Sequence, residues 1–121
     1  MDKEQFQSRT KNLALRIIKL IEALPRQPTA SVIGRQLLRS GTSVGANYRA
    51  ACRARSTADM IAKLKIVEEE ADETLYWLEL LVEANIMPET RLAALVDETN
   101  QVLAMIVASI TTLRKRRNRQ S

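Results

Sequence analysis

The sequence has no histidine, one cysteine and four aromatic residues among its 121 residues, and each shortage excludes a class of protein. Without histidine, the chain cannot form a Ser-His or Cys-His nucleophile, nor the Glu-x-x-His pairs of di-iron helical proteins. Cys52 has no second cysteine to pair with in the same chain, which is the usage expected in a reducing cytoplasm. We therefore expect a protein that is not an enzyme and that uses no cofactor, metal ion or small-molecule substrate.

Long apolar runs and a leader pattern are also missing. No uninterrupted apolar stretch reaches the roughly 18 residues that a membrane span requires. The opening Met-Asp-Lys-Glu-Gln lacks the basic-then-apolar pattern of a signal peptide. We expect a cytoplasmic protein without a membrane partner. Leu, Ala, Ile and Val dominate the 45% hydrophobic content, which favours packed helices over sheets. At this length we expect a single domain over residues 1–121.

Apolar residues recur every three or four positions in four segments, which is the period of an amphipathic helix. The expected helices cover about residues 3–24, 29–54, 57–85 and 88–115. Connections of a few residues place consecutive helices side by side in opposite directions. The sequence therefore predicts an all-α, up-down-up-down antiparallel four-helix bundle.

Local signals mark where these helices begin and end. Thr29 or Ser31 can cap the second helix. Ser56, with Asp59 three residues later, is typical of a capping box that opens the third. Asn85 suits the left-handed residue that follows a helix, and Pro88 suits the first turn of the fourth helix.

The third expected helix is apolar on two sides. Its main seam alternates steps of four and three along Met60, Leu64, Val67, Ala71, Thr74, Leu78 and Leu81. A second apolar group, Ile66, Tyr76, Trp77 and Leu80, lies outside this seam. A monomeric bundle has no use for a second apolar face, and exposing one invites association. The pattern predicts a homo-oligomer with this second group at the subunit interface.

Charge is strongly segregated although the net charge is only +5. Residues 26–65 carry eight basic residues and one acidic residue, whereas residues 66–98 carry one basic and ten acidic residues. One interpretation is that the acidic helix pairs with its basic neighbours. Basic surface left unpaired would attract phosphate. The acidic run from Glu68 to Glu73 is typical of a solvated or salt-bridged helix face, because no histidine supports a transition-metal site.

The second expected helix carries two distinct polar stripes at about 100° per residue. The first stripe is Gln36, Ser40, Ser43 and Asn47. It is interpreted either as a hydrogen-bonded layer inside the protein or at a subunit contact, or as a ligand pocket. Gly41 and Gly45 lie nearby with four-residue spacing, which favours close helix packing over a local kink.

The second stripe is a row of arginines. Arg35, Arg39, Arg49 and Arg53 can pair with Glu69, Glu70 and Glu73, or line a groove that contacts phosphates. The basic tail, Arg114 to Arg119, is either a solvated helix end or a nucleic-acid arm. The few aromatics argue against base stacking, so any binding should be largely independent of base sequence. The candidate nucleic-acid contacts are Arg35, Arg39, Arg49, Arg53, Arg55, Arg114, Lys115, Arg116 and Arg117.

The segment from Arg39 to Asn47, preceded by Gln36, resembles the signature of the bacterial four-helix-bundle protein family, also called the 23S rRNA intervening sequence protein family. The family pattern runs Gln, then Arg-Ser-x-x-Ser-Ile-x-x-Asn, then a Ser that opens the third helix. The matching positions are Gln36, Arg39, Ser40, Ser43, Val44, Asn47 and Ser56. Many members continue with an apolar residue, Ala, Glu and Gly, whereas Asn47 is followed here by Tyr-Arg-Ala-Ala.

The resemblance implies a bundle that assembles as a homopentamer. A related accessory protein of diversity-generating retroelements binds nucleic acid and a reverse transcriptase, so nucleic acid is an implied partner. Together with the arginine row, this leads to the hypothesis of a non-enzymatic oligomer whose basic surface binds the RNA or DNA backbone. The alternative is a protein–protein interaction scaffold in which the arginines serve only subunit contacts.

Overall fold

The computed structural model describes residues 2–120, which form four α-helices and no strand. The helices are α1 (Lys3–Glu22), α2 (Pro28–Cys52), α3 (Thr57–Glu83) and α4 (Glu89–Gln120). The all-α class and the number of helices predicted from the sequence are confirmed. The fourth helix continues more than a turn beyond its expected end at residue 115, so the basic tail is helical.

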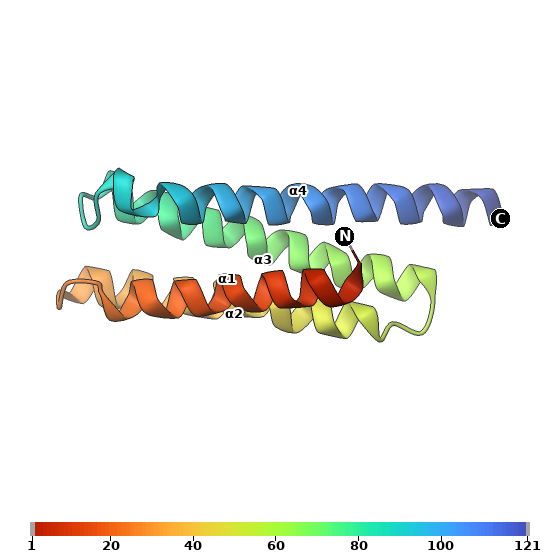
Figure 1. Cartoon of the computed structure of the whole chain (residues 1–121), viewed down its shortest axis with the longest axis horizontal. Coiled ribbons are helices and arrows are strands. Elements are labelled where there is room, and N and C mark those ends of the chain that lie inside the picture. The colour runs from red at the N-terminus through yellow and green to blue at the C-terminus, as the bar shows by residue number, and fades with distance from the viewer. Residues whose placement is uncertain (1, 121) are drawn as a thin grey trace.

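The four helices extend along one long axis (Figure 1). The α1–α2 and α3–α4 connections lie at the same end, which we call the two-loop end, and the α2–α3 connection lies at the opposite, one-loop end. Each helix packs against the next in the chain, whereas α1 meets α4 at few positions and α1 does not approach α3 closely. Helices α1 and α3 therefore lie on a diagonal of the fold.

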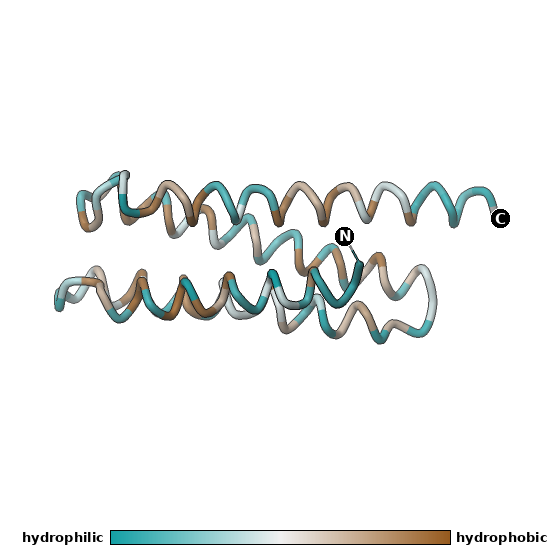
Figure 2. The backbone as a smooth tube through the Cα atoms, viewed as in Figure 1, coloured by the Kyte–Doolittle hydropathy of each residue, from teal (hydrophilic) through white to brown (hydrophobic). Residues whose placement is uncertain are grey.

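The hydrophobic core lies along the facing sides of the helices, and brown and teal alternate along each helix in Figure 2. Its largest fully buried apolar side chains come from all four helices: Leu13, Ile17, Leu37, Leu64, Leu78, Leu81, Leu92 and Ile106. Each such side chain contributes about 1.5–3 kcal/mol when it leaves water. The heptad pattern of the sequence therefore identifies the surface on which α3 packs.

The helix ends follow local chemistry, with one correction. The Ser56 side chain accepts a hydrogen bond from the Asp59 backbone N–H at 3.0 Å, as predicted. Asn85 has the expected positive φ of 59° after α3. Neither Thr29 nor Ser31 caps α2, because the helix begins at Pro28 after an N-cap residue without a side-chain hydrogen bond. Proline fits this first position because its φ is already helical and it lacks the N–H that a cap would satisfy.

Gly41 and Gly45 let α1 and α2 pack closely. A Cβ on Gly41 would collide with the Ile17 side chain, and one on Gly45 would lie 3.3 Å from Oγ1 of Thr10 and 3.4 Å from its carbonyl oxygen. Helix α2 continues without a break past both positions. The prediction of close packing is confirmed, and the kink that was its alternative is not formed.

Helix α4 contains a long apolar stretch. Within the described chain, Glu89–Arg119 is the one helix long and apolar enough to cross a membrane by length and composition. Core helices of water-soluble proteins meet the same criterion, and α4 supplies Leu92, Val102 and Ile106 to the core. Only 28% of its apolar window is buried, so much of α4 faces outward.

Candidate nucleic-acid interface

The arginine row of α2 faces outward, and its members have different surroundings. Arg39 is held by α3: its Nη1 lies 3.2 Å from Glu70 Oε2, and its Nη2 donates to Glu73 Oε2. Its Nε also donates to Gln36 Oε1 at 3.2 Å. The Arg39 side chain remains 48% exposed. For this residue, the prediction of pairing with acids on the third helix is correct.

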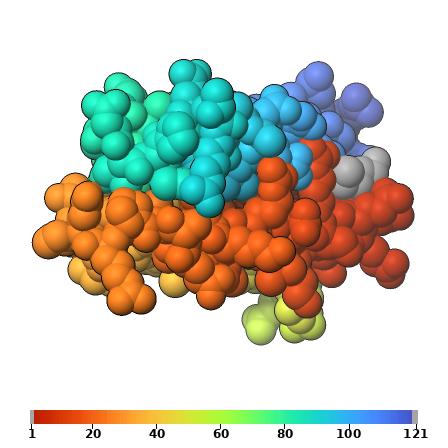
Figure 3. Space-filling model, turned by 60° about the vertical axis from the view of Figure 1, so that its left-hand side comes forward, coloured from red at the N-terminus to blue at the C-terminus, as the bar shows by residue number. Residues whose placement is uncertain are grey.

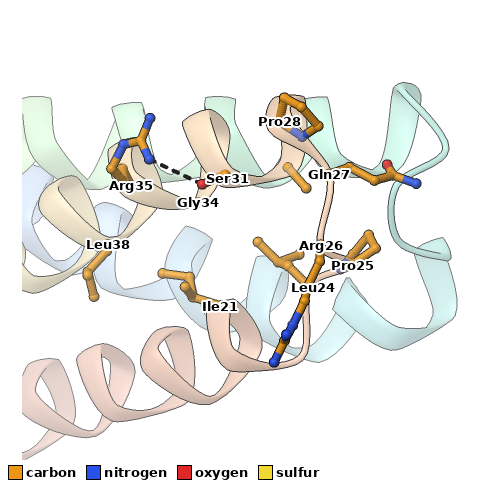
Figure 4. Close-up of a pocket in the computed structure, with 11 residues that line it drawn as sticks. Ile21, Leu24, Pro25, Arg26, Gln27, Pro28, Ser31, Gly34, Arg35 and Leu38 are labelled. Atoms are coloured by element: carbon orange, nitrogen blue, oxygen red, sulfur yellow. Dashed lines mark hydrogen bonds between the residues drawn. The ribbon is translucent and has the colours of Figure 1, made fainter.

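Arg35 lies at the two-loop end and is not paired with an acid in the described chain. Its Nη1 donates to Ser31 Oγ at 3.1 Å, and both residues line a groove of about 500 Å³ between α1 and α2 (Figure 4). Ile21, Leu24 and Leu38 form the apolar part of this groove.

Arg49, Arg53 and Arg55 occupy the one-loop end, and all three are exposed. None of the ion pairs among the described residues involves them. Arg49 and Lys11 line a second α1–α2 groove of about 510 Å³, together with one acid, Glu4, and the groove passes over Gly45. The backbone N–H of Arg55 donates to Asp59 at 3.1 Å, which fixes the loop. At this end, Arg49 and Arg53 therefore carry charges that no ion pair with α3 neutralises.

The alignment of α2 with α3 explains why the row divides. Thr74 Oγ1 donates to Ser40 Oγ at 3.0 Å, and both residues are fully buried. Because α3 runs back along α2, this contact places the acids of α3, which begin at Glu68, beside α2 only as far as about residue 46, and it places Lys65 at the level of Arg49. Lys65 itself pairs with Glu68 at 3.3 Å.

The polar stripe of Gln36, Ser40, Ser43 and Asn47 forms most of its hydrogen bonds within α2. Ser40 alone reaches another helix, through Thr74. Ser43 donates to the Arg39 carbonyl at 2.7 Å, and Asn47 donates to the Ser43 carbonyl at 2.9 Å. Gln36 accepts from Arg39 as described above. The hydrogen-bonded layer therefore exists at one position, and the other three side chains bond within their own helix.

The basic tail extends past the one-loop end (Figure 1). Arg114, Lys115, Arg116 and Arg117 are helical and exposed. Their charges also suit the negative end of the helix dipole. The tail and the Arg49–Arg53 pair thus lie toward the same end of the molecule.

The second apolar face of α3 is smaller than the sequence predicts. Ile66 and Tyr76 are 43% and 53% exposed. Trp77 and Leu80 are only half-buried, because they pack partly against the core. The Trp77 indole N–H also donates to Glu73 at 2.9 Å, which joins Trp77 to the acids that hold Arg39.

The sequence did not predict a hydrogen-bonded ion pair between α1 and α4. The surfaces of these two helices meet in Figure 3. Arg9 donates to Glu98 through Nε and Nη2, both at 2.7 Å, and its Nη2 also donates to Gln101 at 2.7 Å. The hydrogen bond from Arg9 lowers the pKa of Glu98, and Glu98 in turn raises the pKa of Arg9. One signal in the sequence could have indicated this contact. Arg9 lies next to the apolar face of its helix, close to Phe6 and Leu13, and a charged residue at the edge of a buried face can reach a neighbouring helix.

The two remaining groups that could react, Tyr48 and Cys52, both pack against the core. Tyr48 is buried edge-on against Phe6 with ring centroids 4.7 Å apart, and burial raises its pKa to about 12. Cys52 is half-buried and packs against the core. Among the described residues, no group of three or more Cys, Asp or Glu side chains is placed to hold a metal ion.

Four helices without a strand in the described chain, with acids on α3 and arginines along α2, define a small all-α protein with a charged exterior. Residues 3–108 match the family described as 23S rRNA-intervening sequence protein, and the chain belongs to this family. The resemblance carried by Gln36 to Asn47 is therefore confirmed.

A solved structure from the same group of proteins has the same fold. It is the crystal structure of a protein of unknown function from the S23 ribosomal protein family of Bacteroides thetaiotaomicron VPI-5482. It is 34% identical to this chain, with a TM-score of 0.85, and the match covers 92% of this chain and 99% of that one. A comparison with curated proteins found no match.

Proposed function

We propose that this protein is a non-enzymatic, cytoplasmic, up-down-up-down antiparallel four-helix bundle that assembles into a closed homo-oligomer, a pentamer, and binds the RNA or DNA backbone. The observation that carries the proposal is the pair Arg49 and Arg53. Both are exposed, neither has an acidic partner in the described chain, and Lys11 shares a groove with Arg49.

The chemistry of this end suits phosphates. Arginine presents a planar fork of donors that matches phosphate oxygens in pairs. Residues 49 and 53 are one helical turn apart, about 6 Å along the axis, which is close to the spacing of phosphates on an extended strand. The basic tail adds charge toward the same end.

The aromatic residues support backbone binding over base reading. Phe6 and Tyr48 are buried, and Trp77 is half-buried. Only Tyr76 is widely exposed, and it lies on α3 rather than in the arginine row. A surface without a row of exposed rings cannot stack successive bases, so affinity should depend on phosphate charge.

Assembly strengthens this proposal. The interface is proposed to include Ile66, Tyr76, Trp77 and Leu80 of α3. A closed ring multiplies one weak basic patch into several linked ones, and linked sites bind a long polyanion far more tightly than one site.

The test is titration of labelled RNA and DNA with the variant Arg49→Glu/Arg53→Glu. Affinity at about 50 mM salt should fall at least about tenfold, since two phosphate contacts become repulsive. The matched control is Lys19→Glu/Arg91→Glu, an exposed pair with the same charge change that lies outside the arginine row. The fold-loss of affinity in the control should be less than about a third of the fold-loss in Arg49→Glu/Arg53→Glu. Equal losses would show that net charge alone is responsible.

The second candidate is a protein–protein interaction scaffold without a nucleic-acid role. The ion pairs of Arg39 with Glu70 and Glu73 favour it, since they show the row in structural use. The same titration separates the two functions. If the assembled protein binds neither RNA nor DNA at low salt, nucleic-acid binding is excluded and the scaffold function is favoured.

A further inference from the structure

The α1–α2 groove at the two-loop end combines an apolar floor with two unpaired cations (Figure 4). Ile21, Leu24 and Leu38 form the floor, and Leu38 is 37% exposed. Arg26 and Arg35 stand on the rim, and no ion pair among the described residues involves either. A groove of this composition fits a helix that has acids beside an apolar side chain.

Helix α3 presents such a surface. Five exposed residues follow one another at steps of three and four, so they share one outward face, which we call the acidic ridge: Glu69, Asp72, Tyr76, Glu79 and Glu83. The described chain contains no ion pair that uses its four carboxylates. The ridge has an aromatic ring at its centre and no basic residue.

We propose that the acidic ridge of one copy docks in the α1–α2 groove of the next copy. A convex helix then enters a concave site, Arg26 and Arg35 meet carboxylates, and Tyr76 covers the apolar floor. The contact rests on the proposed homo-oligomer and identifies the second face that such an assembly needs. It also assigns Arg35 to the subunit contact, whereas Arg49 and Arg53 stay on the nucleic-acid surface.

The positions of the two surfaces fit a ring. The C-terminal part of the ridge and the groove both lie at the two-loop end, so neighbouring copies stand parallel at the same height. The contact joins two different faces, and such contacts close into a ring when each copy is rotated relative to the last. Because α3 lies diagonally from α1, the ridge and the α1–α2 groove are inclined rather than opposite, which supplies the rotation. All one-loop ends then meet on one rim.

Charge reversal with rescue tests the contact by light scattering on the full chain. The variants Arg26→Glu/Arg35→Glu and Glu79→Arg/Glu83→Arg should each dissociate the oligomer, raising the concentration of half-assembly at least about tenfold. The chain with all four changes has the two signs exchanged and should assemble again. Circular dichroism checks that each variant keeps its helices, and Lys19→Glu/Arg91→Glu is the control that should stay assembled.

The outcomes separate this contact from the proposed function. A wild-type monomer would overturn the docking and the proposed oligomer together. An intact oligomer in Arg26→Glu/Arg35→Glu overturns the docking alone, and a loss of RNA affinity in that intact oligomer would make the groove a polyanion site instead. Failure of the four-change chain to assemble, while still helical, also contradicts the contact. Dissociation by each pair and reassembly of the four-change chain establish it.

Discussion

Arg39 and Arg49 are both exposed on α2, yet their surroundings are opposite. Arg39 faces Glu70 and Glu73, whereas Arg49 is level with Lys65. The difference has two sources: the acids of α3 begin at Glu68 and reach α2 only as far as about residue 46, and Arg49 is turned toward α1, where it lines a groove with Lys11. An arginine row in a sequence is thus not one functional unit, because the neighbouring helix decides which of its members remain available.

Arg9 extends this comparison to a third environment. Its side chain and that of Glu98 are only 22% and 18% exposed, whereas Arg39 is 48% exposed and Arg49 is unpaired at the surface. The three residues form a series from a half-buried pair, through an exposed pair, to a cation without an acidic partner in the described chain. Their contributions to stability should decrease in that order, while their availability to a polyanion should increase.

The largest effect is expected for Arg9→Ala. The change removes two charge-assisted hydrogen bonds from a half-buried carboxylate, which should cost about 2 kcal/mol of unfolding free energy. Urea denaturation of wild type and variant measures this difference. A loss below about 0.5 kcal/mol would place Arg9 in the same class as a surface residue.

The same pair predicts a dependence on pH. Arg9 lowers the pKa of Glu98, so the stability from this carboxylate is fully present above the ordinary glutamate pKa and is lost as pH falls through the lowered one. The gap in stability between wild type and Arg9→Ala should therefore stay constant from about pH 7 to 5 and shrink below about pH 4. Urea denaturation at several pH values tests this, and a gap that widens on acidification would reverse the sign of the argument.

A smaller effect is expected for Arg39→Ala. Its two carboxylate partners lie on α3, but the guanidinium is about half exposed, so water and salt weaken the pair. The loss should be about 0.5 kcal/mol and should diminish at high salt. Thermal unfolding at low and high salt measures it, and a salt-independent loss would point to packing rather than charge.

The smallest effect on stability is expected for Arg49→Ala. With no ion pair in the described chain, its removal should change the unfolding free energy by less than about 0.5 kcal/mol. Arg49→Ala should weaken RNA binding more than Arg39→Ala does. Stability and RNA-binding assays on both single variants test this difference, and equal changes in both assays would contradict it.

Features set by neighbouring residues could be predicted from the sequence. The helical period gave the four helices, and Ser56 and Asn85 marked two ends because caps depend on a few adjacent positions. The spacing of Gly41 and Gly45 likewise indicated close packing. The cap of α2 was missed because Pro28 already favours the first helical turn.

Features set by the alignment of one helix with another could not be predicted. Arg9 and Glu98 are 89 positions apart, and no local pattern joins them. The separate surroundings of Arg39 and Arg49 depend on the alignment of α2 with α3, which the Ser40–Thr74 hydrogen bond marks. The half-burial of Trp77 depends in the same way on how α3 packs against its neighbours.

The most direct test of the account is the salt dependence of RNA affinity in wild type and Arg49→Ala/Arg53→Ala. Each phosphate contact on single-stranded RNA contributes about 0.7 to the slope of log affinity against log salt. Wild type should show a steep slope, and the variant should show a slope that is shallower by about 1.4 for each protein chain in contact with the RNA, because two contacts are lost per chain. Identical slopes, or no binding by wild type at about 50 mM salt, would contradict the claim that these two arginines contact phosphate.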